Sequence, residues 1–166
     1  MFENVTIVGG PLVLQSPAEV DAAEVQLGIR FPTGYREYVT RLGEGVLGGA
    51  YVRIYPPRRI MSGNNNVAEW RQRIDEYWHW DDGQDVLTKE QVVGSVIIGD
   101  TVDGDELIVR PDNPERIYVL PRDSEAILIA GDGLPAAIEW LCSSGELAEA
   151  FAERNFEPFD SRQEPE

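Results

Sequence analysis

The stretch EVQLGIRFPTGYREYVTRLGEG, residues 24–45, predicts two helices that meet at a short corner. The first helix is expected to end at Gly28, because glycine readily adopts the left-handed conformation that often closes a helix. Pro32 is expected in the first turn of the second helix, where its missing N–H costs no hydrogen bond. Helical spacing then gives one apolar, mostly aromatic face, formed by Phe31, Tyr35, Tyr38, Val39 and Leu42. This pattern favours a scaffold for binding over a reaction centre.

Helices and short apolar strands alternate along the rest of the chain. A capping box begins at Ser16, and asparagines at 64–66 are candidate caps for a helix that extends to about Trp80. The buried stripe of that helix is expected to contain Val67, Trp70, Ile74 and Tyr77. Helices are therefore expected over residues 17–27, 32–42, 67–80, 135–142 and 145–156.

Strands are expected where short apolar runs alternate with turn-forming residues. Gly9-Gly10-Pro11 separates two such runs near the N-terminus, and short turns connect the later ones in the manner of an antiparallel meander. The expected strands cover residues 4–8, 10–14, 51–55, 95–98, 106–110, 116–120 and 126–129. The fold class is thus α+β, a mainly antiparallel sheet flanked by helices in one domain over residues 1–156. Residues 157–166 are expected to form an acidic, frayed tail.

The charge balance limits the choice of partners. The chain has 166 residues, with 30 acidic against 14 basic side chains, and a net charge of −16. Such a charge repels nucleic acid and anionic membranes and speeds encounter with basic proteins, although acidity also serves solubility alone. Neither a signal peptide nor an apolar run of membrane-spanning length is expected, so the predicted location is cytoplasmic. The sequence leaves the oligomeric state open.

Few residues could support catalysis or bind a metal or cofactor. His79 is the one histidine and Cys142 the one cysteine, which excludes a zinc site with the usual nitrogen and sulfur ligands and any disulfide within the chain. The glycines at 43–49 lack the Lys-Ser or Lys-Thr of a phosphate-binding loop and are expected to form a flexible connection. Asp103-Gly104 predicts a hairpin turn rather than a calcium loop. No catalytic, cofactor-binding or metal-binding residue is therefore expected.

Aromatic and acidic residues follow one another after the third expected helix. Indoles beside carboxylates are typical of an interface anchor surrounded by steering charge, although these tryptophans could instead cover a second apolar surface. The predicted partner-binding residues are Trp78, Trp80, Asp81, Asp82, Asp85, Asp103 and Asp105.

The opening stretch also resembles a known family. Glu24, Leu27-Gly28, Phe31-Pro32, Tyr35 and Tyr38, followed by Gly43 and Gly45, are similar to the N-terminal signature of the SMI1/KNR4 family in the SUKH superfamily. Later segments extend this resemblance over about residues 17–150: Ile97-Ile98-Gly99-Asp100, Gly104-Asp105, Ile117-Tyr118-Val119 and the helix with Ile138, Trp140 and Leu141. The tryptophan-rich segment around 64–93 departs from the family pattern.

The resemblance implies an α+β fold without known catalytic residues. Many bacterial members resemble immunity proteins, which bind and block a cognate toxin, often a nuclease, whereas fungal relatives are regulatory interaction proteins. The expected function is therefore that of a non-catalytic protein-binding module, an immunity protein whose partner is a basic toxin domain. The alternatives are a regulatory interaction protein without a toxin and, with less support, an enzyme that acts through carboxylates. The family signature itself is expected to be scaffold.

Overall fold

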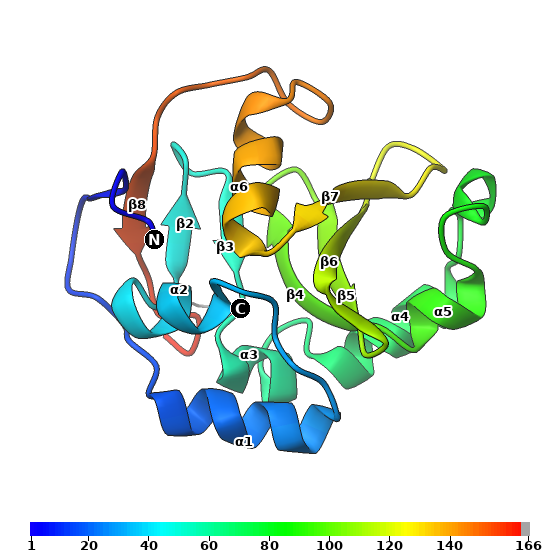
Figure 1. Cartoon of the computed structure of the whole chain (residues 1–166), viewed down its shortest axis with the longest axis horizontal. Coiled ribbons are helices and arrows are strands. Elements are labelled where there is room, and N and C mark those ends of the chain that lie inside the picture. The colour runs from blue at the N-terminus through cyan, green and yellow to red at the C-terminus, as the bar shows by residue number, and fades with distance from the viewer. Residues whose placement is uncertain (164–166) are drawn as a thin grey trace.

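One mixed sheet runs through the molecule, and helices pack around it (Figure 1). The computed structural model describes residues 1–163, and within them the strand order is β1-β8-β2-β3-β4-β5-β6-β7. β1 pairs with β8 in parallel, and every other pair is antiparallel, so the predicted α+β class with a mainly antiparallel sheet is confirmed. The strands are β1 (Thr6–Ile7), β2 (Gly45–Leu47), β3 (Val52–Ile54), β4 (Val96–Thr101), β5 (Glu106–Arg110), β6 (Asn113–Leu120), β7 (Leu128–Asp132) and β8 (Asn155–Pro158).

The helices follow capping signals in the sequence. Ser16 accepts a hydrogen bond from the Glu19 N–H and the Glu19 side chain accepts one from the Ser16 N–H, and Gly28 closes the first helix in the left-handed conformation at φ 65°. The helices are α1 (Pro17–Leu27), α2 (Tyr35–Arg41), α3 (Pro57–Ser62), α4 (Val67–Glu76), α5 (Lys89–Val93) and α6 (Leu134–Ser143), with a 3-10 turn, η1 (Asp81–Gly83). The expected helix over 17–27 is confirmed, whereas α3 and α5 were not predicted.

The second helix begins three residues later than predicted. Pro32 lies in a turn, because the Tyr35 N–H donates to the Pro32 carbonyl and Gly34 has φ 91°. The N–H of Thr33 donates to the Glu115 carboxylate on β6, at 2.9 Å, rather than to helical backbone. A contact from the sheet therefore decides where α2 starts.

The predicted meander is confirmed in β4 to β7. β4, β5, β6 and β7 are neighbours in chain order, so their odd and even connections lie at opposite ends of the strands. The β4–β5 turn and the β6–β7 loop therefore share one end of the sheet. α6 packs against β6 and β7, while α3 and α4 pack against β4.

The end of the chain differs from the prediction. The expected helix over 145–156 is wrong: residues 146–154 are irregular and Asn155–Pro158 form β8, which lies between β1 and β2 with Phe156 fully buried. The helical spacing of the apolar residues is overridden because β2 needs a neighbour on its outer edge. Likewise the glycine-rich connection at 43–49 contains β2.

The expected frayed tail over 157–166 needs a correction in its first part. β8 crosses the expected boundary at residue 156, and the N–H groups of Phe159 and Ser161 donate to Glu44, through its carbonyl and its carboxylate. Hydrogen bonds to the buried Glu44 thus order Phe159 and Ser161, although the local composition predicts a frayed tail there. Residues 164–166 lie outside the described part of the chain.

Candidate protein-binding site

In the aromatic segment after α4, the structure differs from the prediction in which side chains are exposed and which are buried. Tyr77, expected in the buried stripe, is 71% exposed, because α4 ends at Glu76 and Tyr77 leaves the helical conformation at φ −122°. Trp80, predicted as a partner contact with burial on a second apolar surface as the alternative, is 4% exposed, and its indole N–H donates to the Pro121 carbonyl at 2.8 Å. Trp80 is therefore a core residue, and its predicted role as a surface contact is corrected.

Trp78 lies between the exposed Tyr77 and the buried Trp80 in the chain. Its side chain is half-buried, its indole N–H donates to Asp81 Oδ1 at 2.7 Å, and its ring meets the ring of Trp80 edge-on at 5.5 Å. The His79 ring lies 3.9 Å from the ring of Trp80, as predicted for a histidine among indoles. Residues 77–80 thus form an ordered aromatic segment beside exposed carboxylates, here called the aromatic step.

Close packing against the β6–β7 loop positions the acidic residues of η1. A Cβ atom on Gly83 would lie 2.4 Å from Ile127 Cγ1, so only glycine permits this approach. The side chains of Asp81, Asp82 and Asp85 remain exposed around this contact.

The β4–β5 turn brings a further carboxylate to the same loop. Asp103 is exposed at the tip of the turn. Asp105 is buried, where it accepts hydrogen bonds from Thr101 Oγ1 at 2.9 Å and from the Arg122 N–H at 3.0 Å. Asp105 therefore fastens the turn to the β6–β7 loop, and its predicted role as a partner contact is corrected.

The exposed carboxylates of these loops are here called the acidic rim. It consists of Asp81, Asp82, Asp85, Asp103, Asp123, Glu125 and Glu146, all exposed. Within residues 1–163 none of these carboxylates lies in an ion pair. A surface pocket between the loops is lined by the acidic residues Asp103, Asp105, Asp123 and Glu146, by Arg122 and Ser124, and by the apolar Leu147 and Pro121. The rim can therefore attract a cation without first breaking an internal ion pair, although Asp81 accepts a hydrogen bond from the Trp78 indole.

About half of the residues of this site are predicted correctly from the sequence. Asp123, Glu125, Glu146 and Tyr77 were missed as site residues. A usable signal existed for the first two, because alternate connections of a meander lie at the same end of the sheet, and the loop after residue 120 is acidic. No local pattern places Glu146 or exposes Tyr77.

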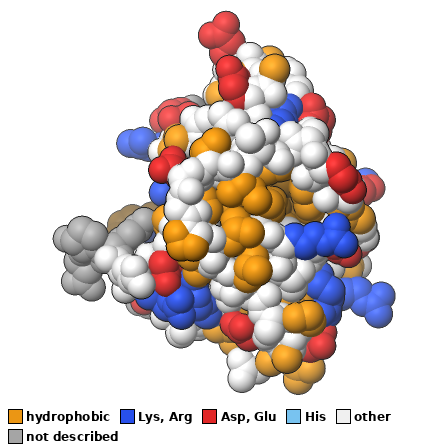
Figure 2. Space-filling model, turned by 90° about the vertical axis from the view of Figure 1, so that its left-hand side faces the viewer, with side chains coloured by type: hydrophobic (Ala, Val, Ile, Leu, Met, Phe, Trp, Pro, Cys, Tyr) orange, Lys and Arg blue, Asp and Glu red, His pale blue; other side chains and the backbone are white. Residues whose placement is uncertain are grey.

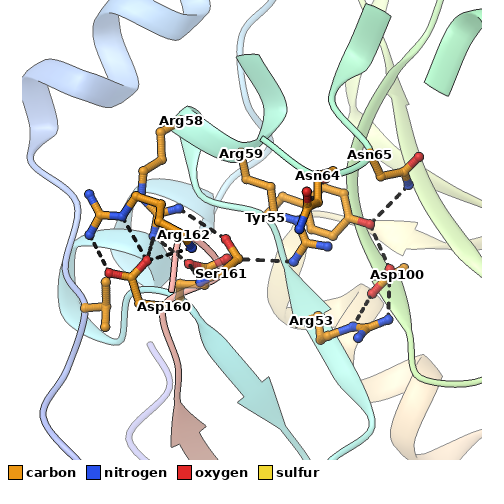
Figure 3. A network of polar contacts seen from close by, with 12 residues as sticks. Arg53, Tyr55, Arg58, Arg59, Asn64, Asn65, Asp100, Asp160, Ser161 and Arg162 are labelled. Atoms are coloured by element: carbon orange, nitrogen blue, oxygen red, sulfur yellow. Dashed lines mark hydrogen bonds and ion pairs between the residues drawn. The ribbon is translucent and has the colours of Figure 1, made fainter. Parts of the chain in front are cut away.

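Buried carboxylates elsewhere are engaged in internal bonds (Figure 3). Asp100 on β4 accepts hydrogen bonds from Arg53 Nε at 2.7 Å and from the Tyr55 hydroxyl at 2.7 Å. Its cross-strand neighbour Glu106 accepts from Trp70 Nε1, at 3.2 Å, and from Arg73. These bonds join the sheet to α4, which supports the segment that carries Tyr77.

A second cluster in Figure 3 connects α3 to the end of the chain. Glu44 is almost fully buried, and its carboxylate accepts from Arg58 Nη2 at 2.5 Å and from the Ser161 N–H at 3.0 Å. Arg59 links the two clusters, because its guanidinium lies 4.0 Å from the centre of the Tyr55 ring. Burial raises the pKa of the Cys142 thiol, in agreement with its predicted role as a small core residue.

The described residues also bear on metal and membrane binding. Within residues 1–163 no three or more His, Cys, Asp or Glu side chains are grouped as metal ligands. In the same part of the chain, no helix has the length and apolar character needed to cross a membrane.

Comparison with known proteins agrees with the family signature. Residues 15–132 match the family model described as SMI1 / KNR4 family (SUKH-1), which is more than half of the chain. Comparison with curated proteins and with solved structures gives no match. Glu24 explains part of the signature, since its carboxylate accepts a hydrogen bond from the Phe31 N–H at 2.7 Å and so fixes the corner between α1 and α2. The chain belongs to the SMI1/KNR4 family (SUKH-1).

Proposed function

We propose that this chain is a non-catalytic protein-binding module, an immunity protein that neutralises a bacterial toxin by covering a basic surface of it. The observation that carries the proposal is the acidic rim, whose exposed carboxylates come from separate loops and lie in no ion pair within the described residues. Nuclease toxins need basic surfaces for their substrate, and an acidic inhibitor can occupy such a surface. The encounter would take place in the cytoplasm.

Affinity would come from the aromatic step rather than from charge alone. Rim charges mainly accelerate encounter, whereas tyrosine, tryptophan and arginine anchors contribute most of the energy of an interface. Tyr77 is the exposed aromatic residue beside the rim, and Trp78 is held by Asp81 and Trp80. An arginine side chain of the partner could lie on these rings while its charge meets the carboxylates.

A carboxylate-dependent enzyme receives less support. Such an enzyme needs two carboxylates with different protonation behaviour in one pocket. The buried candidates Asp100, Glu106 and Glu44 all accept hydrogen bonds from arginine, tyrosine, tryptophan or backbone groups. We therefore assign these residues to stability.

The test is charge reversal in the rim. Tagged wild-type chain is used to capture the protein encoded beside it, and the variant Asp82→Lys is compared with Glu153→Lys, which makes the same charge change at an exposed carboxylate outside the rim. Asp82→Lys should weaken binding by about tenfold or more at low salt, mainly through slower association. Glu153→Lys should change it little. Co-expression should protect cells from the captured toxin with wild-type chain and less well with Asp82→Lys.

Two results would contradict the proposal. Equal loss of binding by both variants would show that net charge, and not the rim, matters. Capture of a partner without toxicity would instead favour a regulatory interaction protein, the alternative function.

A further inference from the structure

One peptide unit in the β6–β7 loop is held at both of its polar ends. Its carbonyl, that of Pro121, accepts a hydrogen bond from the indole N–H of Trp80 at 2.8 Å. Its N–H, that of Arg122, donates to Asp105 Oδ1 at 3.0 Å. The two polar groups lie in one rigid plane, because a peptide bond is planar. Trp80 belongs to the aromatic step and Asp105 to the β4–β5 turn, so this plane joins two segments that are distant in the sequence.

The two side chains that hold this peptide unit are buried. Trp80 is 4% exposed and Asp105 is 6% exposed, so water has little access to either bond. A buried polar group that loses its partner costs free energy that an exposed group does not. A peptide whose carbonyl accepts while its N–H donates is also polarised, so each bond strengthens the other. Loss of one bond is therefore expected to weaken the other.

Close packing accompanies these bonds. Gly83 of η1 approaches the loop so closely that a Cβ atom there would lie 2.6 Å from the backbone nitrogen of Ile127. The side chain of Arg122 lies against the β4–β5 turn, where a Cβ atom on Gly104 would be 2.9 Å from Arg122 Cδ. The β6–β7 loop thus contacts both η1 and the turn, and each of these carries exposed carboxylates of the acidic rim.

We propose that the peptide unit between Pro121 and Arg122 is a clamp that couples the aromatic step to the β4–β5 turn and so preorganises the acidic rim. Trp80 and Asp105 are then positioning residues: they hold the loop, and contact with a partner is left to exposed side chains. The value of the clamp for binding rests on the proposed function of the rim. The coupling itself does not, because it is a property of the free chain.

The clamp acts against repulsion between the carboxylates of the rim. Like charges on neighbouring loops favour separation of those loops. The face of the molecule toward β1 and β8 is different, because hydrophobic side chains gather at its centre and charged ones lie mostly toward its margin (Figure 2). A surface that is fixed before binding loses less conformational entropy when a partner arrives. The clamp therefore lets the rim keep its charge concentrated without becoming loose.

The experiment is hydrogen exchange of the full chain, followed by nuclear magnetic resonance. Rates are compared with that of the Ile108 amide, in a fully buried position of β5 between two paired strands, which corrects for any change in global stability. Asp105→Ala should accelerate exchange of the Trp80 indole N–H by about tenfold or more relative to Ile108, although that indole bonds to another residue. Asp105→Asn keeps an oxygen acceptor and should restore most of the protection. Asp103→Ala, at an exposed carboxylate of the same turn, is the matched control and should change nothing.

The coupling is expected in the reverse direction as well. Trp80→Phe keeps an aromatic ring but removes the indole N–H, and it should accelerate exchange of the Arg122 amide by a similar factor relative to Ile108. With a captured toxin, Asp105→Ala should weaken binding by about tenfold whereas Asp105→Asn should not, because only the alanine loosens the clamp.

Several outcomes would overturn the inference. A Trp80 indole that exchanges as slowly in Asp105→Ala as in the wild-type chain would show that the two bonds are independent. Equal acceleration by Asp103→Ala would assign the effect to the charge of the turn, and lack of rescue by Asp105→Asn would exclude the hydrogen bond as its cause. Coupling in a chain that captures no toxin would support the clamp and count against the proposed function, whereas independent bonds in a chain that captures one would do the reverse.

Discussion

At the scale of residues, two aromatic side chains exchange the roles that spacing alone assigns to them. Helical periodicity places Tyr77 inside and leaves Trp80 either at the surface or on a second apolar surface, but α4 already ends at Glu76. Trp80 then turns inward because the β6–β7 loop offers both an apolar pocket and the Pro121 carbonyl for its indole N–H. The helical spacing of apolar residues predicts which side chains are buried only as far as the helix extends.

Truncation of these two residues should therefore change the free energy of unfolding by very different amounts. Trp80→Ala should lower the free energy of unfolding by about 3–5 kcal/mol, as for other buried tryptophans. Tyr77→Ala should change it by less than about 0.5 kcal/mol, because its ring is exposed. Urea denaturation of both variants measures the difference. Equal destabilisation would mean that Tyr77 also packs in the interior.

The signature residues are scaffold because their contacts are internal. Tyr35 is fully buried, stacks on Phe31 at 4.0 Å between ring centres and donates its hydroxyl hydrogen to the Tyr55 carbonyl at 2.7 Å. The glutamate of the signature holds the Phe31 N–H. These contacts explain why the motif identifies the family without identifying a partner.

At the scale of elements, local sequence succeeds where partners are neighbours along the chain. The meander from β4 to β7 is built from short turns, so its strands pair with what comes next. β8 is different, because it pairs with β2 and β1, which lie more than a hundred residues earlier. No local pattern states that pairing.

β8 is expected to be an essential part of the core. Phe156→Ala should destabilise the protein by about 3–5 kcal/mol, because the ring is fully buried and contacts Tyr38 edge-on at 5.9 Å. Glu157→Ala, at the next and exposed position of β8, is the matched control and should stay within about 0.5 kcal/mol. Thermal or urea unfolding measures both. An unchanged midpoint for Phe156→Ala would show that β8 is dispensable.

At the scale of the whole molecule, charge and apolar surface are separated. The acidic rim occupies the loop end of the meander, whereas four exposed hydrophobic residues, Met1, Ile7, Val8 and Leu14, lie in the first fourteen positions. Three of the rim carboxylates, Asp81, Asp82 and Asp85, come from the segment after α4, and the others come from separate loops. The scaffold thus carries a surface assembled from several loops.

Buried tyrosines make the fold sensitive to alkaline conditions. Burial raises the pKa values of Tyr35, Tyr38, Tyr51 and Tyr55, and that of Tyr51 reaches about 12 with the help of nearby Asp105 and Asp103. The unfolded chain ionises its tyrosines near pH 10, so their contribution is complete below about pH 10 and is lost as pH rises through the folded values. Stability should therefore fall above about pH 10.

Denaturant unfolding at rising pH, followed together with tyrosinate absorbance, measures this effect. Tyr51→Phe is the control, because it removes one of these groups and should make the loss of stability with pH less steep. If stability stayed constant through the alkaline range, or if Tyr51→Phe left the slope unchanged, the burial of these hydroxyls would not control it.

The sequence by itself determined the family, the α+β class, α1 with its caps and the meander, because these follow from contacts between near neighbours and from a motif with local hydrogen bonds. It also determined the acidity and excluded a zinc site with the usual nitrogen and sulfur ligands, because both are matters of composition. Only the tertiary structure decided the start of α2, the place of β8, the inversion of Tyr77 and Trp80, and the union of separate loops into the acidic rim. Each of these depends on a partner distant in the chain, and the energy of such a contact is not visible in the residues that surround it.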